Sequence, residues 1–346
     1  MKTNHIYTML KKDNKKKEWN QKSIRNSKLI SKAGIVLFLF VILLFPASSY
    51  TGAKKGLLLW FNTVLPSLLP FIIVSNLIIG LGLTKPLGKF FYPLFHTLFG
   101  ISRGGCYPVL IGFLSGIPVG AKTVADLVED GSISVKEGQY LLGFCNNASP
   151  VFIMSYIAIS QLNLPQARFH LLLIIYLSGI FSAFLLFRFL PNVGLSKKNV
   201  VSVMGFEERG INCSQPKSYF SLLDSSIMNG FEVITKVGGY IILFSIPAQI
   251  ISSLGTNGSY LKLLSIGLLE ITTGINQISL SGLKISTKIA LITMITAFGG
   301  LSGIAQTKSV INNTRLSVGI YMKSKLLHML LALFLSYLYA RFILPA

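Results

Sequence analysis

The sequence predicts an all-α, polytopic membrane protein. Hydrophobic residues make up 51% of the 346 residues and charged residues only 12%, and the mean hydropathy is +0.63. In an ordinary soluble domain about a quarter of the residues are charged. Apolar runs also recur that are long enough to cross a hydrocarbon core of about 30 Å, which takes about 20 helical residues. These runs lie near residues 33–50, 57–82, 139–160, 168–190, 226–254, 288–312 and 325–345.

The net charge of +21 is concentrated ahead of the first apolar run. Ten of the 32 Lys and Arg residues lie before position 33. This pattern predicts a disordered basic tail, residues 1–32, that stays in the cytoplasm and contacts anionic lipids. We expect no nucleic-acid partner. Residues 33–55 are predicted to form a transmembrane anchor, with a signal peptide whose apolar region is 35–45 as the alternative.

The rest of the chain shows the same order of features twice. The first half reads "GLLLWFNTVLPSLLPFIIVSNLIIGLG" (56–82), "IGFLSGIPVG" (111–120) and "GFCNNASPVFIMSY" (143–156). The second reads "GFEVITKVGGYIILFSIPAQIISSLG" (230–255), "IGLLEITTG" (266–274) and "AFGGLSGIAQTKSV" (297–310). Gly120 and Gly274 are 154 residues apart, as are Phe144 and Phe298. We therefore expect two repeats, 56–191 and 223–346, separated by a polar loop at 192–222.

The short apolar segments 106–121 and 261–280 can be full crossings or re-entrant elements. If both are re-entrant, two basic regions lie in the cytoplasm, as the positive-inside rule favours. Each half then has three crossings, so the repeats are inverted, and interrupted helices in inverted repeats are typical of secondary transporters. Residues 86–102 are predicted to be an amphipathic helix at the membrane interface. The basic regions are the central loop, with Lys197, Lys198, Arg209 and Lys217, and the segment with Arg315, Lys323 and Lys325.

Two interruptions in the first half are candidate solute sites. In "GFLSGIPVGAK" (112–122) Pro118 breaks a helix, and backbone N–H groups freed at a helix start suit an anion, to which Lys122 adds a charge. The alternatives are helix packing through glycines and an ordinary interface role for Lys122. In "FCNNASPVF" (144–152) the polar residues line a cavity or form an interhelical clamp. The candidates are Ser115, Gly116, Pro118, Gly120, Lys122, Asn146, Asn147 and Ser149.

The second half supplies matching candidates. Glu270 is a carboxyl within an apolar segment, where a charge costs about 2.5–3.5 kcal/mol even on the milder scales. The roles open to it are coordination of a cation, relay of a proton and pairing with a lysine, and we expect it to bind a coupling ion or proton. Polar residues and glycines near Glu270 and in "FGGLSGIAQ" complete the predicted solute site. They are Thr272, Thr273, Gly299, Gly300, Ser302 and Gln306.

Taken in order, "LPSLLPFIIVSNLIIGLG", "LSGIPVGAK", "NNASPVFI", "LLEITTG" and "FGGLSGIAQ" resemble the YlbJ-like family of sporulation integral membrane proteins, over roughly residues 35–345. The resemblance implies a nucleoside-recognition or Gate domain, related to halves of concentrative nucleoside transporters. It also implies export of dipicolinic acid from the mother cell during endospore formation, for cortex and spore maturation. Departures from the family pattern are Ile117, where an aromatic residue is expected, and Cys145, Asn147 and Ala148.

The sequence thus predicts a transporter for a small anionic solute, and the family resemblance implies a place in the mother-cell membrane. Cysteines and histidines have no metal-ligand spacing, and no nucleophile with a base is evident, so we expect no metal, no cofactor and no enzymatic activity. Besides the solute, the expected partners are a coupling proton or Na⁺ and anionic lipids, with a homo-oligomer left open. An intramembrane enzyme acting on a lipid-linked precursor is one alternative. A scaffold or channel subunit for spore-envelope assembly is the other.

Overall fold

The computed structural model describes residues 32–189, 218–254 and 259–344. The predicted tail (1–32), except Lys32, and most of the predicted central loop (192–222) lie outside these ranges. The chain has two compact units, residues 1–50 and 51–346. In the first, an apolar helix spans 32–44 and α2 (Pro46–Leu59) begins, so the predicted anchor (33–55) falls on these two helices.

The prediction of an all-α membrane protein is confirmed. Within the described residues there is no strand, and five helical stretches are long and apolar enough to cross a membrane. A sixth is added if α4 (Thr84–Phe99) and α5 (Arg103–Ser115), which are bent by 93°, are counted as one span. The five are Pro46–Gly80, Pro165–Leu186, Tyr219–Ser253, Ile285–Ile311 and Val318–Phe342.

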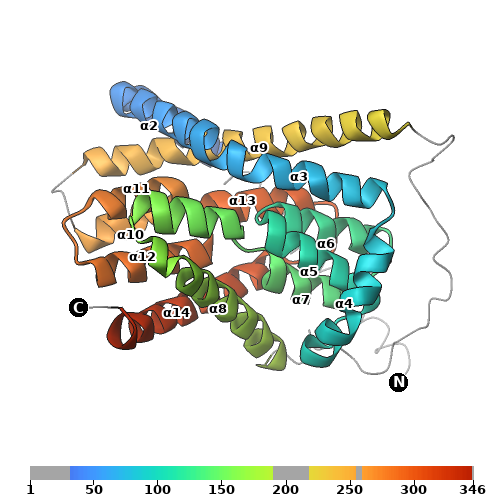
Figure 1. The fold of residues 1–346 in the computed structure, drawn as a ribbon. Helices are drawn as coiled ribbons and strands as arrows, with labels where there is room; N and C mark the ends of the chain where they lie inside the picture. Colours follow the sequence, from blue (N-terminus) through green and yellow to red (C-terminus); the bar gives the residue numbers. More distant parts are fainter. Residues whose placement is uncertain (1–31, 190–217, 255–258, 345–346) are drawn as a thin grey trace, which may run out of the picture. The chain divides into compact units, whose positions relative to one another are not determined.

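The second unit is built from the same series of elements twice (Figure 1). Each series has a long helix, two short helices in a hairpin, a helix with a break, and another long helix. In the first half these are α3 (Leu65–Gly80), α5 with α6 (Val119–Glu129), α7 (Val135–Cys145) with η2 (Phe152–Gln161), and α8 (Arg168–Phe189). In the second they are α9 (Tyr219–Ser253), α10 (Tyr260–Leu269) with α11 (Ile271–Leu280), α12 (Ile285–Phe298) with α13 (Gly300–Ile311), and α14 (Val318–Phe342).

Corresponding long helices pack against each other in opposite directions. Trp60, in the π-helical turn η1 (Trp60–Val64) ahead of α3, donates from Nε1 to the carbonyl of Ile234 in α9 at 2.9 Å. Asn76, near the end of α3, donates to Ser226, near the start of α9, at 3.2 Å. Figure 1 shows α5, α6 and α7 at one end of α9 and α10, α11 and α12 at the other. The repeat is therefore inverted.

Each hairpin is closed by a pair of glycines. A Cβ at Gly120 in α6 would lie 2.9 Å from the Cα of Gly112 in α5, and a Cβ at Gly274 in α11 would overlap the Cα of Gly267 in α10. The absence of side chains lets the two backbones touch. At about 1.5 Å per residue, helices of 10 to 13 residues are about half as long as a membrane core is thick. Each pair thus has the dimensions of a re-entrant hairpin.

Between α3 and the first hairpin lies α4, which falls on the predicted interface helix at 86–102. Its Tyr92 and Phe95 pack against the core around α5 and α7, whereas Phe90, Leu94 and Leu98 are exposed. α4 ends at Gly100, whose φ of 66° is left-handed and favours glycine.

Candidate functional site: a pocket where four chain breaks meet

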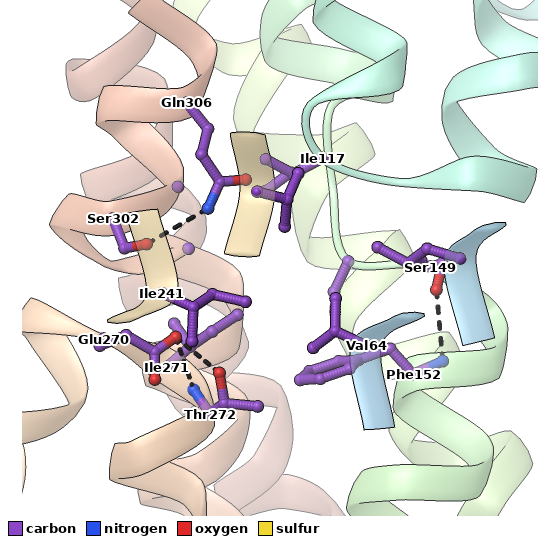
Figure 2. Close-up of a pocket in the computed structure, with 15 residues that line it drawn as sticks. Val64, Ile117, Ser149, Phe152, Ile241, Glu270, Ile271, Thr272, Ser302 and Gln306 are labelled. Carbon is purple, nitrogen blue, oxygen red and sulfur yellow. Dashed lines mark hydrogen bonds between the residues drawn. The ribbon is translucent and has the colours of Figure 1, made fainter. Parts of the chain in front are cut away.

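A pocket forms in the second unit where both hairpin tips and both broken helices converge. Its cavity volume is about 60 Å³. At roughly 10–15 Å³ for one water molecule, this is room for a few water-sized groups. Figure 2 shows Ser302, Gln306 and Glu270 on one wall and Ile117, Ser149 and Phe152 facing them. The lining is Val64, Leu68, Ile117, Ala148, Ser149, Phe152, Val237, Ile241, Glu270, Ile271, Thr272, Gly299, Ser302, Gly303 and Gln306.

The tip of the first hairpin reaches the pocket through Ile117. Gly116 ends α5 with a φ of 77°, a conformation that favours glycine, and lies against the backbone of Ser149. The Ile117 N–H donates to the carbonyl of Asn147 at 3.0 Å. Across the pocket, the Ile117 side chain faces Gly299 and Gly303, which have no side chain to fill the space. The tip is thus hydrogen-bonded to the first broken helix and packed against the second.

The break between α7 and η2 contains the two asparagines, and both are buried. Asn146 donates to the hydroxyls of Thr307 and Tyr321, each at 2.9 Å, and accepts from the Ala121 N–H at 3.3 Å. Asn147 accepts from the Lys325 ammonium at 2.7 Å. Both side chains therefore connect the break to other helices, as an interhelical clamp does.

Glu270 forms the break between α10 and α11 and caps α11. Its backbone is extended, and its carboxylate accepts from the Thr272 N–H at 3.1 Å, the Thr272 hydroxyl at 2.6 Å and the Thr273 N–H at 2.6 Å. Such a cap satisfies N–H groups that have no partner inside the helix. The Thr273 hydroxyl lies 3.0 Å from that of Ser245 in α9, away from the pocket lining.

The break between α12 and α13 uses two glycines with left-handed backbones, Gly299 at φ 85° and Gly300 at φ 67°. From the first turns of α13, Ser302 and Gln306 point into the pocket, where the Gln306 amide donates to the Ser302 hydroxyl at 3.2 Å. These two side chains are the polar part of this wall.

The structure brings some of the predicted site residues onto the pocket and leaves others around it. On the lining are Ser149, Glu270, Thr272, Gly299, Ser302 and Gln306. Off it are Ser115, Gly116, Pro118, Gly120, Lys122, Asn146, Asn147, Thr273 and Gly300. Lys122 is half-exposed on α6 and pairs with Asp126 at 2.9 Å.

One charged residue differs from its sequence-based placement. The sequence assigns Lys325 to a basic cytoplasmic segment, but the structure buries it completely in α14. The burial was not foreseen because sequence proximity to Arg315 and Lys323 does not reveal which face of α14 packs against α7 and α8. The sequence signal that could have indicated this burial is the apolar run that directly follows Lys325.

The apolar walls were also missed by sequence reasoning. Val64 and Leu68 in the first half and Val237 and Ile241 in the second come from the crossing of η1 and α3 with α9. Such residues look like any others on a membrane helix. The pocket combines these walls with several hydroxyl and amide groups, and Glu270 is the ionisable residue on its lining.

Among curated proteins, the chain is similar to the sporulation integral membrane protein YlbJ of Bacillus subtilis (strain 168). The two are 26% identical over 313 residues, which cover 82% of this chain and 75% of that protein. The resemblance to the YlbJ-like family is confirmed. No family model matches the chain, and no solved structure does. Together with the candidate spans, the similarity indicates a multi-pass integral membrane protein.

Proposed function

We propose that this protein is a secondary transporter that moves a small polar solute by alternating access around the pocket. The observation that carries the proposal is the convergence of two hairpin tips and two broken helices, related by an inverted repeat, on one cavity. Irregular backbone at membrane depth is tolerated where it is buried in protein or lines a water-filled cavity. Inverted repeats with discontinuous helices place solute sites at their interface.

The solute class that we propose is a small anion. Three helical segments, η2, α11 and α13, begin at residues on or next to the pocket lining, and helix starts carry partial positive charge. At the start of α11 the Glu270 carboxylate already accepts hydrogen bonds from the N–H groups that carry this charge. An anion in the pocket would be repelled by Glu270 unless a cation neutralised it. We therefore propose that Glu270 binds a coupling proton or Na⁺ as the anion binds.

The candidate anion is dipicolinic acid, which the family resemblance implies. The similarity to a sporulation membrane protein supports placing the transporter in the mother-cell membrane, with the N-terminus in the cytoplasm, where it would export the solute for spore maturation. We propose no enzymatic activity. The alternative remains a scaffold or channel subunit for spore-envelope assembly.

The test is uptake of labelled dipicolinate into proteoliposomes, with nucleosides and other small acids as competitors. Ser302→Leu narrows the pocket, whereas Ser265→Leu changes an exposed serine of α10 and serves as the matched control. We expect saturable uptake that falls at least about tenfold in Ser302→Leu, the equivalent of roughly 1.4 kcal/mol, and stays near wild type in the control. Uptake of no solute by a folded protein would contradict the transporter.

Deleting residues 1–30 separates the transporter from the scaffold. A transporter that still inserts correctly retains its uptake, because the pocket is formed by residues 64–306. A scaffold that recruits partners through the basic tail loses its function in a sporulation assay. Loss of sporulation in the deletion strain with uptake intact would favour the scaffold.

A further inference from the structure

Lys325 is a buried cation whose role the pocket does not explain. It has no exposed surface, and its Nζ donates to Asn147 Oδ1 at 2.7 Å and lies 5.6 Å from the centre of the Tyr321 ring. In the described part of the chain, no carboxylate forms an ion pair with it. An ammonium has three donors, and an unpaired charge at membrane depth is costly. Such a residue is a functional site by default.

Lys325 is surrounded by titratable groups that are not carboxyls. The carboxyl of a neighbouring helix, α7, is bonded to another residue. α14 contributes Tyr321 and His328, and α7 contributes the Cys145 thiol at its end. α8 faces this region through the backbone of Ile175 and Gly179, and α13 through the Thr307 hydroxyl. In α12 the ionisable residue, Lys288, donates to Ser279 in α11. In α7, Glu137 accepts from Ser102.

Two polar atoms near Lys325 are buried without a hydrogen-bond partner among the described residues. One is the Ser324 hydroxyl, and the other is Nδ1 of His328. His328 Nε2 donates to the Ile175 carbonyl at 2.8 Å, so Nδ1 of the neutral ring has a free lone pair. Residues three apart are neighbours on a helix, which places His328 beside Lys325 as a proton acceptor.

Asn147 links this buried cation to the pocket. Its side-chain oxygen accepts from Lys325, and its backbone carbonyl accepts from the Ile117 N–H at the hairpin tip. Ile117 in turn lines the pocket against Gly299. Two hydrogen bonds, both made by Asn147, therefore connect Lys325 Nζ to Ile117, the residue that lines the pocket.

We propose that Lys325 is a proton-binding site that sets the position of the hairpin tip at Ile117 through Asn147. This inference rests on the proposed transporter function and adds a second protonation site, distinct from Glu270. Binding converts the Nζ amine to an ammonium, and no other bond changes. The ammonium holds Asn147 with a charge-assisted hydrogen bond, which is roughly twice as strong as a neutral one. Loss of the proton loosens Asn147 and frees the tip.

The test measures the hairpin tip and needs no solute. In a variant whose three cysteines are replaced by alanine, Ile117→Cys reports tip accessibility through its rate of labelling by N-ethylmaleimide. The scan runs from about pH 5.5 to about pH 10.5, across the ordinary ranges of histidine and lysine. Asn313→Cys, at an exposed position in the polar turn after α13, corrects for the thiolate fraction at each pH.

We expect the corrected rate to change at least about threefold in one transition when Lys325 is present, because the charge-assisted bond is lost. In Lys325→Met the corrected rate stays flat. The same pH curve in both proteins overturns the proposal.

Lys325→Gln is the second variant, to be used where the methionine variant fails to fold. Lys325→Met removes the buried charge but also leaves the Asn147 oxygen without its donor, so a lower melting temperature is expected and the pH curve decides. A lower melting temperature with an unchanged pH curve identifies a purely structural clamp and overturns the proposal. A Lys325-dependent curve in a protein that takes up no solute overturns the transporter alone.

Discussion

At the scale of single residues, Glu270 is the position where the structure requires a carboxylate. All three hydrogen bonds of its carboxylate are accepted from Thr272 and Thr273 at the start of α11. Glu270→Gln replaces one acceptor oxygen by an NH₂ donor, which then faces another donor. We expect the free energy of unfolding to fall by about 1–2 kcal/mol, as for loss of a helix cap.

The measurement is denaturant unfolding in detergent micelles. Glu129→Gln, at the exposed end of α6, is the matched control and is expected to change stability by less than about 0.5 kcal/mol. Equal stability of Glu270→Gln and wild type would show that the cap is not formed.

Substitution of Lys122 tests whether this cation contributes to solute uptake. It is half-exposed and pairs with Asp126 on the surface of α6, and such pairs are worth about 0–1 kcal/mol. We expect Lys122→Ala to take up solute within about twofold of wild type, because the side chain does not line the pocket. Asp126→Ala should likewise take up solute within about twofold of wild type. A selective loss of uptake in Lys122→Ala would instead place an anion site on α6.

At the scale of elements, the two hairpins depend on glycine contacts. A Cβ at Gly120 would lie 2.9 Å from the Gly112 Cα and 3.0 Å from the Cys145 carbonyl, and a Cβ at Gly274 would meet the Gly267 backbone. Overpacking costs typically about 1–3 kcal/mol, so Gly120→Ala and Gly274→Ala should both lower the melting temperature.

The matched control is Gly239→Ala in α9, where an added Cβ meets nothing within 4 Å. Alanine favours a helix over glycine by roughly 1 kcal/mol, so this variant should be neutral or slightly more stable. Equal melting temperatures of all three variants would mean that the hairpin backbones do not touch. The quantity to compare is the melting temperature in one detergent.

Much of this element order was predictable from the sequence. Gly120 and Gly274 are equally placed in the two halves because both close a hairpin, and Phe144 and Phe298 correspond because both lie at the end of a half-helix. The details of the site were less predictable. Periodicity does not reveal that Asn146 clamps three helices, nor that Lys325 faces α7, because these depend on how helices far apart in sequence rotate against each other.

At the scale of the whole second unit, the central claim is one pocket reached alternately from both sides of the membrane. The most direct test is Ser302→Cys in the cysteine-free protein, labelled by a membrane-impermeant thiol reagent in right-side-out and in inside-out vesicles. We expect labelling from each side, slowed on both sides by the transported solute, because Ser302 lies on the shared pocket wall. Labelling from one side alone, or from neither, would contradict it.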